Sequence, residues 1–353
     1  MRTIQAEKYN IYIGNELLSE LNAFLKQKNY KSAFILVDEN TKKHCLKSLK
    51  RASFIFPPVI ISIKSSEKNK TIRTCEKIWN ELSKHHADRQ SLFINLGGGV
   101  ISDIGGFCAS TYKRGIDFVN IPTTLLSQVD ASVGGKTGID FNNFKNQIGT
   151  FTFPKAVFII PGFLRTLNKR ELVSGFAEVI KHGLIADRNY WKEIRSVKDL
   201  KNIGPEIISR SVEIKNKIVS ADPFEKGQRK SLNFGHTIGH AIESALLKTK
   251  KPLLHGEAVA IGMICEGYLS RKYCGLPSKS LNEIISFIVP FFQLKEIGIS
   301  EAKLIGLMKQ DKKNKDSEIN LTLLKEIGSV EINHTCTEEL IDESIKFFNT
   351  LCQ

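Results

Sequence analysis

The sequence lacks the cysteine pattern of a disulfide framework or of a thiolate zinc site. Its seven cysteines are odd in number and scattered, and no Cys-x-x-Cys pair occurs. This usage predicts a reducing compartment. The first ten residues contain no apolar signal core, and no apolar run approaches the roughly 20 residues that span a bilayer. We therefore expect a soluble cytoplasmic protein without a membrane partner.

Signatures of nucleic-acid binding are also missing. Zinc-finger, RNP and basic-zipper patterns do not occur, and the lysine runs at 248–251 and 312–315 do not alternate with aromatic residues. The formal net charge is nevertheless +14. A basic surface attracts phosphates and anionic metabolites as well as nucleic acid. We expect no nucleic-acid partner and expect a minority of the cations to bind an acidic small molecule.

Length and pattern predict two domains, because 353 residues exceed the size at which a single core stops growing. Residues 1–161 alternate β-branched runs with helical periodicity, which favours an α/β nucleotide-binding domain with a mostly parallel sheet. Residues 162–353 favour an all-α domain, because long amphipathic segments follow one another without convincing strands. Strands are expected at 32–37, 59–63, 91–95, 117–121 and 156–160. Helices are expected at 71–85, 100–112, 172–186, 205–220, 231–247, 256–274, 281–292 and 338–350.

Two glycine-rich segments come close to phosphate-binding motifs. Gly97-Gly98-Gly99 follows an expected strand and opens a helix, so the backbone there can approach a diphosphate. Ser102 occupies the last position of the Gly-x-Gly-x-x-Gly fingerprint, which therefore fails, and a glycine turn without a ligand is the alternative. Residues 132–138 imitate a Walker A loop, but Asp130 stands where its first glycine is required. This excludes a P-loop nucleotidase and leaves a glycine loop whose lysine suits an anionic substrate.

Polar residues elsewhere suit a nucleotide and an anion. Residues 38–41 (Asp-Glu-Asn-Thr) end an expected strand, where an acidic side chain can bind ribose hydroxyls or, as the alternative, cap a helix. Further cations are individually typical of a protein surface. Gathered in one cleft, they would hold a substrate that carries both phosphate and carboxylate. They are Lys113, Arg114, Lys145, Lys181, Lys215, Arg229 and Lys230.

Three histidines suggest a metal site. His236 and His240 share a face if the segment is helical, and His255 follows within 20 residues. Three imidazoles give nearly the whole ligand set of a catalytic zinc ion. A carboxylate could complete the set, and Glu178 is one candidate among several. The alternative is that each histidine is a capped or packed helical side chain.

Together these motifs resemble the 3-dehydroquinate synthase family of sugar phosphate cyclases. The resemblance runs from Asp38 through His255 with the motifs in order, and the segment from Lys309 to Leu324 looks similar too. It implies an α/β N-terminal domain that binds NAD and a helical C-terminal domain that carries the metal. Ser102 departs from the family, whose members commonly have glycine there.

The resemblance also implies roles for individual residues. Glu178, His236 and His255 would bind Zn2+, with Co2+ as a substitute, and His240 would handle protons on the substrate side. NAD would be contacted by Asp38, Asn40, Glu67, Lys70, Gly98, Gly99, Val100, Asp103, Thr123, Thr124, Lys136, Lys145 and Thr166. The substrate would be contacted by Arg114, Asp130, Lys136, Lys145, Asn146, Lys181, Lys215, Arg229 and Asn233, with Lys312 or Lys313 in addition.

The implied reaction converts 3-deoxy-D-arabino-heptulosonate 7-phosphate to 3-dehydroquinate and phosphate in the shikimate pathway of aromatic amino acid biosynthesis. It proceeds by transient oxidation with NAD, phosphate elimination, reduction and intramolecular aldol closure, and the family implies a homodimer. A metal-dependent polyol dehydrogenase of the same architecture is one rival, but it has no need of so many cations. A cyclase for another sugar phosphate is the closer rival. It would be expected to change the carboxylate contacts, and Lys215, Arg229, Asn233 and His240 are all present.

Overall fold

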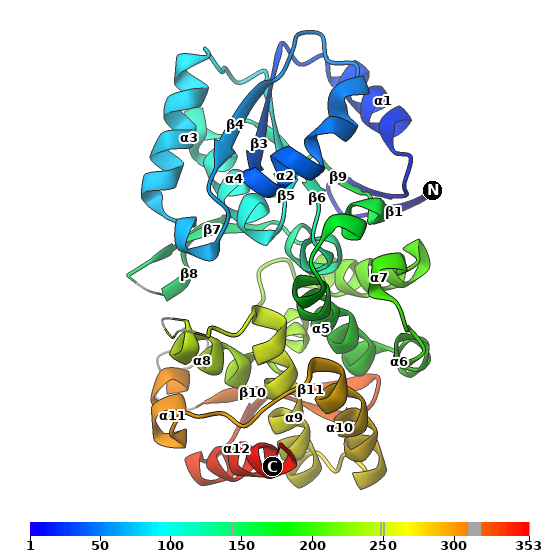
Figure 1. Cartoon of the computed structure of the whole chain (residues 1–353), viewed down its shortest axis with the longest axis vertical. Helices are drawn as coiled ribbons and strands as arrows, with labels where there is room; N and C mark the ends of the chain where they lie inside the picture. The colour runs from blue at the N-terminus through cyan, green and yellow to red at the C-terminus, as the bar shows by residue number, and fades with distance from the viewer. Residues whose placement is uncertain (143, 248, 250, 310–318, 353) are drawn as a thin grey trace. The chain divides into compact units, whose positions relative to one another are not determined.

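The computed structural model describes the chain except residues 143, 248, 250, 310–318 and 353 (Figure 1). It divides into two compact units. The first unit comprises Met1–Asn168 and Lys201–Ser220, and the second comprises Lys169–Leu200 and Ala221–Gln353. In the described part of the chain, no helix has the length and apolar character needed to cross a membrane. Lys312 and Lys313, expected near the substrate, lie outside the described residues.

The first unit is built on a seven-stranded sheet with the order β1-β2-β9-β6-β5-β3-β4. All its strand pairs are parallel except β1 with β2. The strands are β1 (Arg2–Gln5), β2 (Asn10–Ile13), β3 (Ser32–Asp38), β4 (Val59–Ile63), β5 (Ser91–Gly97), β6 (Asp117–Pro122) and β9 (Ala156–Ile159). The five expected strands are therefore present, and the α/β character of this part is confirmed. β1 and β2 were not predicted.

Hydrophobic residues cover both faces of this sheet. Along β3, Phe34 and Leu36 join one core cluster, whereas Ile35 and Val37 join the other. This alternation explains the uninterrupted apolar run, because successive side chains of a strand point to opposite faces and both faces are covered here. The helices of the unit are α1 (Leu18–Lys28), α2 (Glu39–His44), α3 (Ile72–Lys84), α4 (Gly99–Thr111) and α7 (Pro205–Ala221). A separate hairpin is formed by β7 (Lys136–Phe141) and β8 (Phe144–Phe151).

The second unit is helical, as predicted. Its helices are α5 (Lys169–Ala186), α6 (Arg188–Arg195), α8 (His236–Leu246), α9 (His255–Tyr273), α10 (Ser278–Phe292), α11 (Glu301–Lys309) and α12 (Glu338–Leu351). It also contains a hairpin of β10 (Asn320–Glu326) and β11 (Ser329–Thr335), which the sequence pattern did not predict. The hairpin packs on α9, where Ser270 Oγ accepts a hydrogen bond from the Leu324 amide at 2.8 Å. α9 is buried almost all round, so it forms the centre of this unit.

The compact units differ from the predicted domains 1–161 and 162–353 at α7. This helix belongs to the first unit, although its position in the chain led us to expect it in the helical domain. Asn216 donates a hydrogen bond to the Gln5 carbonyl at 3.1 Å, and Glu213 forms an ion pair with Arg2. A change of sequence pattern indicates a single boundary between two domains. Here the chain leaves the first unit after Asn168, returns to it at Lys201 and leaves it again after Ser220.

Candidate active site

Eleven of the thirteen residues expected to contact NAD follow the carboxyl ends of five parallel strands of the first unit, whereas Lys136 and Lys145 lie on the β7–β8 hairpin. These ends lie at one edge of the sheet, and the strand order reverses between β3 and β5. Ligands of open parallel sheets bind outside the carboxyl ends at such a switch point. The residues are Asp38 and Asn40 after β3, Glu67 and Lys70 after β4, Gly98, Gly99, Val100 and Asp103 after β5, Thr123 and Thr124 after β6, and Thr166 after β9. The topology thus brings segments that are far apart in sequence to a common edge.

The glycine turn after β5 is tightly packed. A Cβ atom added to Gly97 would lie 2.4 Å from Cγ1 of Ile101, and one added to Gly98 would lie 3.0 Å from Cγ2 of Thr124. α4 begins at Gly99 and has no side-chain cap, so its first N–H groups stay available to an anion. Ser102, the departure from the fingerprint, is buried in the first turns of α4.

Asp38 caps α2. Its Oδ1 accepts hydrogen bonds from the amides of Asn40 and Thr41, both at 2.8 Å, and Thr41 Oγ1 accepts one from the Asp38 amide. The alternative interpretation of residues 38–41 as a helix cap is therefore correct. These bonds use only Oδ1 of the carboxylate, which leaves ribose binding compatible with the cap.

A buried lysine links four other expected site residues. Lys70, which is 2% exposed, places Nζ 2.6 Å from Oδ2 of Asp103 and 2.5 Å from Oδ1 of Asn146. Glu67 lies 3.8 Å from Lys70 Nζ and 3.5 Å from Lys145 Nζ. Burial lowers the pKa of Lys70, but the charges of Asp103 and Glu67 outweigh burial and raise it. The charged Lys70 therefore holds β8 and α4 together.

Four further expected residues lie in other parts of the first unit. The buried Lys215 of α7 places Nζ 2.6 Å from Oδ1 of Asp130 and donates to the Asp130 carbonyl at 2.7 Å. Lys136 is the exposed first residue of β7 and follows Gly134 and Gly135, which both have positive φ. Arg114 is exposed and precedes β6, so it lies beside the amino ends of the parallel strands. Asp38 and the other residues that follow the strands lie at the opposite, carboxyl-end edge of the sheet.

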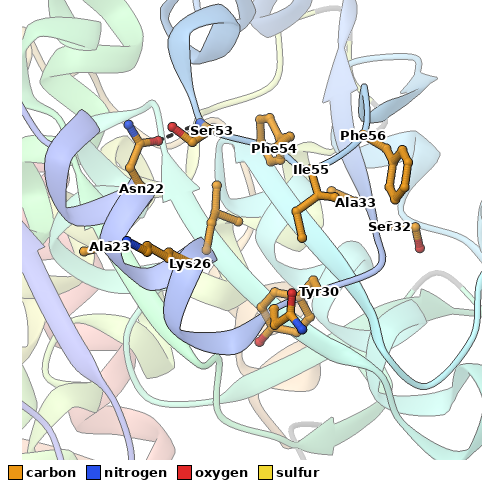
Figure 2. A pocket seen from close by; sticks show the side chains of 12 residues that line it. Asn22, Ala23, Lys26, Tyr30, Ser32, Ala33, Ser53, Phe54, Ile55 and Phe56 are labelled. Atoms are coloured by element: carbon orange, nitrogen blue, oxygen red, sulfur yellow. Dashed lines mark hydrogen bonds between the residues drawn. The ribbon is translucent and has the colours of Figure 1, made fainter.

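A cavity of about 360 Å³ also lies at that amino-end edge (Figure 2). Its lining includes Ser32 at the start of β3, Lys26 of α1, and the exposed side chains of Ile55 and Phe56. β3 is seven residues long, which corresponds to about 20 Å between this cavity and Asp38. The cavity is therefore separate from the expected NAD residues.

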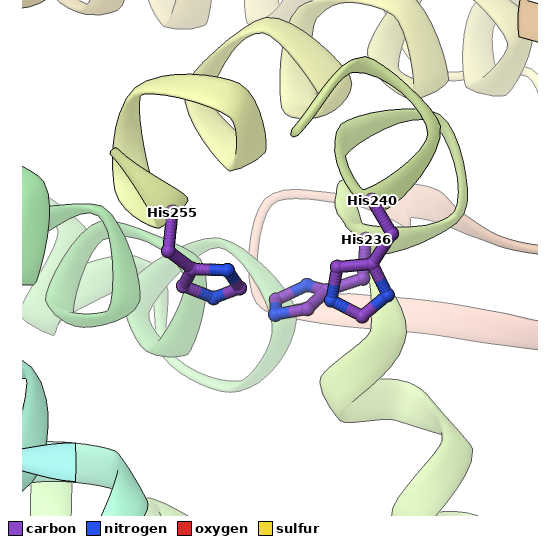
Figure 3. A group of neighbouring side chains, drawn as sticks. All are labelled: His236, His240 and His255. Carbon is purple, nitrogen blue, oxygen red and sulfur yellow. The ribbon is translucent and has the colours of Figure 1, made fainter. Parts of the chain in front are cut away.

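The three histidines come together in the second unit, as the sequence suggested (Figure 3). His236 begins α8, His240 follows one turn later, and His255 begins α9. One ring nitrogen of each lies within 4.8 Å of one ring nitrogen of the others.

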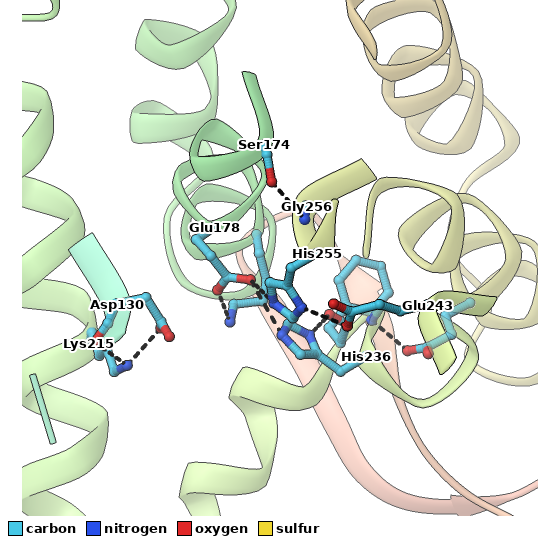
Figure 4. Close-up of polar contacts among 12 residues, drawn as sticks. Asp130, Ser174, Glu178, Lys215, His236, Glu243, His255 and Gly256 are labelled. Carbon is cyan, nitrogen blue, oxygen red and sulfur yellow. Dashed lines mark hydrogen bonds and ion pairs between the residues drawn. The ribbon is translucent and has the colours of Figure 1, made fainter. Parts of the chain in front are cut away.

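Glu178 of α5 faces two of these rings (Figure 4). Its Oε1 lies 3.3 Å from Nε2 of His236 and 3.6 Å from Nε2 of His255. The carboxylate is fully buried, and neither oxygen has a hydrogen-bond partner within the described parts of the chain, although Lys181 forms an ion pair with it. A buried acceptor without such a partner costs about 1–3 kcal/mol. A divalent cation between the carboxylate and the imidazoles would remove this cost, so these residues fit a metal ion.

Hydrogen bonds orient both rings toward Glu178. Nδ1 of His236 donates to the Phe234 carbonyl at 3.1 Å, and Nδ1 of His255 donates to Oε2 of Glu243 at 3.2 Å. Both partners can only accept, so Nδ1 carries the proton and Nε2 of each ring remains for a ligand. Metal-binding histidines usually donate their other ring N–H to a carboxylate or a backbone carbonyl, as both rings do here.

The charges of the site suit a cation. Burial raises the pKa of Glu178, but the Lys181 ammonium and the imidazoles of His236 and His255 together outweigh burial and hold this pKa well below its ordinary value. Burial lowers the pKa of His236, which keeps that ring neutral. Burial also lowers the pKa of His255, but the charges of Glu243 and Glu178 raise it to about 10. A bound cation would take the place of the second His255 proton.

The remaining expected residues of the second unit lie on α5 and on the segment before α8. Lys181 is buried on α5. Arg229 donates to the Pro223 carbonyl at 2.6 Å, and Nδ2 of Asn233 donates to Oε1 of Glu225 at 2.9 Å.

Sequence reasoning did not identify two carboxylates that support the histidines. Glu243 lies two turns after His236, a spacing that could have revealed it. Glu266 of α9 is fully buried and accepts the amides of Gly235 and Ile238 at 2.6 and 3.2 Å, which holds the start of α8 in place. No local signal marked Glu266, because its partners lie on another helix.

Comparison with known proteins identifies the family. The family model for the N-terminal domain of 3-dehydroquinate synthase matches residues 60–174, and the family model for the C-terminal domain matches residues 175–314. The chain belongs to the 3-dehydroquinate synthase family. A 3-dehydroquinate synthase of Parabacteroides distasonis is 44% identical over 342 residues, which cover 96% of this chain and 97% of the relative. The sequence-based assignment to this enzyme family is confirmed.

Solved structures share the fold. A 2-deoxy-scyllo-inosose synthase, determined with carbaglucose-6-phosphate, NAD+ and Co2+, aligns with a TM-score of 0.87 at 20% identity over 98% of this chain and all of that one. The 2-epi-5-epi-valiolone synthase of Streptomyces hygroscopicus, determined with NAD+ and Zn2+, aligns with a TM-score of 0.84 at 23% identity over 99% of both chains. This chain thus shares its fold with these two synthases.

Proposed function

We propose that this member of the 3-dehydroquinate synthase family converts 3-deoxy-D-arabino-heptulosonate 7-phosphate to 3-dehydroquinate and phosphate in the shikimate pathway. It acts as a phosphate-eliminating carbon–oxygen lyase. The observation that carries this proposal is that both domain models of the synthase family match the chain in succession.

NAD binds along the carboxyl-end edge of the first-unit sheet, and Zn2+ or Co2+ binds Glu178, His236 and His255. When bound, NAD takes up and returns a hydride within one turnover, and the metal acts as a Lewis acid on substrate hydroxyl oxygens. Two observations support this assignment: most of the expected NAD residues share one sheet edge, and the Glu178 oxygens lack hydrogen-bond partners within the described residues. Related synthases have been determined with NAD+ and Co2+ or Zn2+.

The protein's own residues place cations where the substrate carries negative charge. Lys136, Lys145, Asn146 and Lys181 bind the phosphate end, and preorganised donors there stabilise the charge that develops as phosphate leaves. Lys215 and Arg229 bind the carboxylate and hydroxyls. Lys215 is oriented by Asp130, and Arg229 by the Pro223 carbonyl.

Two polar side chains complete the substrate contacts. We assign His240 the transfer of protons to and from the substrate; its ring lies beside that of His236, whereas Glu178 faces the rings of His236 and His255. Glu225 accepts a hydrogen bond from the amide nitrogen of Asn233, and we assign the amide oxygen of Asn233 a contact with a substrate hydroxyl.

Arg114 reaches the substrate only from a second copy of the chain. It precedes β6 at the amino-end edge, whereas the NAD residues of the first unit lie at the carboxyl-end edge, about 20 Å away for a six-residue strand. A homodimer resolves this separation. Mixing an Arg114→Ala chain with a His240→Ala chain should then restore part of the activity, because one of the two sites in a mixed dimer is intact.

The decisive assay supplies the heptulosonate phosphate with NAD far below the substrate concentration. We expect phosphate release in excess of NAD, no net NADH, and a product that a coupled dehydratase converts to an enone. NADH formed in proportion to substrate would instead indicate a polyol dehydrogenase.

We place the enzyme in the cytoplasm, without a nucleic-acid partner. All seven cysteines are free, which agrees with a reducing compartment.

A further inference from the structure

A second cluster of metal-ligating side chains lies in the second unit. Cys274 is the C-cap residue that follows α9, and Glu331 and His334 lie on β11. Sγ of Cys274 is 3.5 Å from Nε2 of His334 and 3.9 Å from Oε2 of Glu331, and the last two atoms are 2.9 Å apart. Each side chain is partly exposed, so an ion can enter from solvent.

A β-bulge brings Glu331 and His334 together. Residues three apart in a regular strand point to opposite faces. Here Leu321 pairs with His334 and Leu323 pairs with Glu331, so β11 has one residue more than β10 between the two pairs. Asn333 lies in this extra stretch with a φ of 63°. The bulge therefore turns the side chain of His334 to the same face of the hairpin as the side chain of Glu331.

The distances suit a tetrahedral zinc ion. Zinc lies about 2.3 Å from a thiolate and about 2.0–2.2 Å from imidazole nitrogen or carboxylate oxygen, so pairs of its ligand atoms are about 3.4–3.6 Å apart. The three separations of the cluster differ from these values by about 0.5 Å or less. A set of sulfur, nitrogen and oxygen donors favours zinc over magnesium or calcium, which prefer oxygen alone.

This cluster is remote from the candidate active site. His255 begins α9 and Cys274 follows its last residue, so about 28 Å of helix separates the two. None of the three residues contributes to the set around Glu178.

We propose that Cys274, Glu331 and His334 bind a second zinc ion, with water as the fourth ligand, and that this ion fastens the end of α9 to the β10–β11 hairpin. Without metal, burial and the charge of Glu331 raise the pKa of the Cys274 thiol to about 11. Zinc binding therefore releases the thiol proton to solvent and leaves a thiolate ligand.

Cobalt substitution tests the proposal independently of the catalytic function, because the site around Glu178 contains no cysteine. We expect the full-length protein to bind two cobalt ions per chain and to show a thiolate-to-cobalt charge-transfer band in the near ultraviolet. Cys274→Ser and His334→Ala should each bind one ion fewer and lose this band while keeping synthase turnover. Cys352→Ser is the matched control, since Cys352 is also a partly exposed helix-end cysteine.

The His236→Ala variant isolates the second site. It should still bind one cobalt ion with the thiolate band, and zinc should raise its melting temperature but not that of the His236→Ala/Cys274→Ser variant. A wild-type protein without the band, or a band that survives in Cys274→Ser, would overturn the proposal whatever the synthase assay shows.

Discussion

Nδ1 of His255 and Oε2 of Glu243 lie 3.2 Å apart and join the start of α9 to the middle of α8. The contact fixes the ring so that Nε2 faces Glu178 of α5, 3.6 Å away. Three helices thus converge on one point, and the proposed metal site depends on Glu243, a carboxylate outside the proposed ligand set.

Replacing Glu243 should weaken metal binding. Glu243→Ala removes the acceptor of His255 Nδ1, and loss of such a partner lowers metal affinity about 10- to 100-fold. Glu243→Gln keeps an acceptor oxygen and should lose less. Competition with a chelator of known affinity measures both, and equal affinities for all three proteins would contradict the proposed orientation.

The metal content of histidine variants shows which side chains bind the metal. Chelation should abolish turnover, and Zn2+ or Co2+ should restore it. His236→Ala and His255→Ala should each lose one metal ion per chain, whereas His240→Ala should keep its metal and lose turnover. If His240→Ala loses metal to the same extent as the other two, all three histidines are ligands and the assignment of His240 to proton transfer is wrong.

Lys136→Ala should slow phosphate release about 10- to 100-fold. A charge-assisted contact is worth about 1.5–3 kcal/mol, which is lost in full if it acts in the transition state. Lys136 is also among the residues expected to contact NAD, but NAD affinity should fall much less than the rate of phosphate release, because the turn at residues 97–99 is unchanged. Lys84→Ala, an exposed lysine of α3, serves as control. Phosphate release that is indifferent to Lys136→Ala would exclude this lysine from the phosphate site.

Lys70→Met should destabilise the first unit. It leaves Asp103 and Asn146 without their shared cation, and breaking a buried pair by removing one partner costs about 3 kcal/mol or more. The neighbouring Lys68 is exposed, so Lys68→Met should leave the free energy of unfolding unchanged. Urea denaturation measures both, and similar midpoints for the two variants would show that the cluster does not stabilise the fold.

Local patterns determined the secondary structure wherever burial follows a regular period. The run from Ser32 to Val37 could be assigned to a strand because it is apolar on both faces, and the helix from 71 to 85 because its apolar residues recur along one side. The hairpin β10–β11 escaped prediction because its strands pack on α9 and carry no simple alternation. The spacing of His236 and His240 likewise predicted from the sequence that their rings lie together, because a helix places residues four apart on one face. His255 joins them from the start of another helix.

Tertiary structure alone decided which groups meet. Glu178 was one carboxylate among several until α5 buried it against two imidazoles, and Glu266 had no local signal at all. The bulge at Asn333 is a register shift between paired strands, which one strand's sequence does not express. The periodicity of side chains along a helix or strand depends on residues that are close in the chain, so the sequence expresses it. Which side chains meet at one site depends on the packing of elements that are distant in the chain.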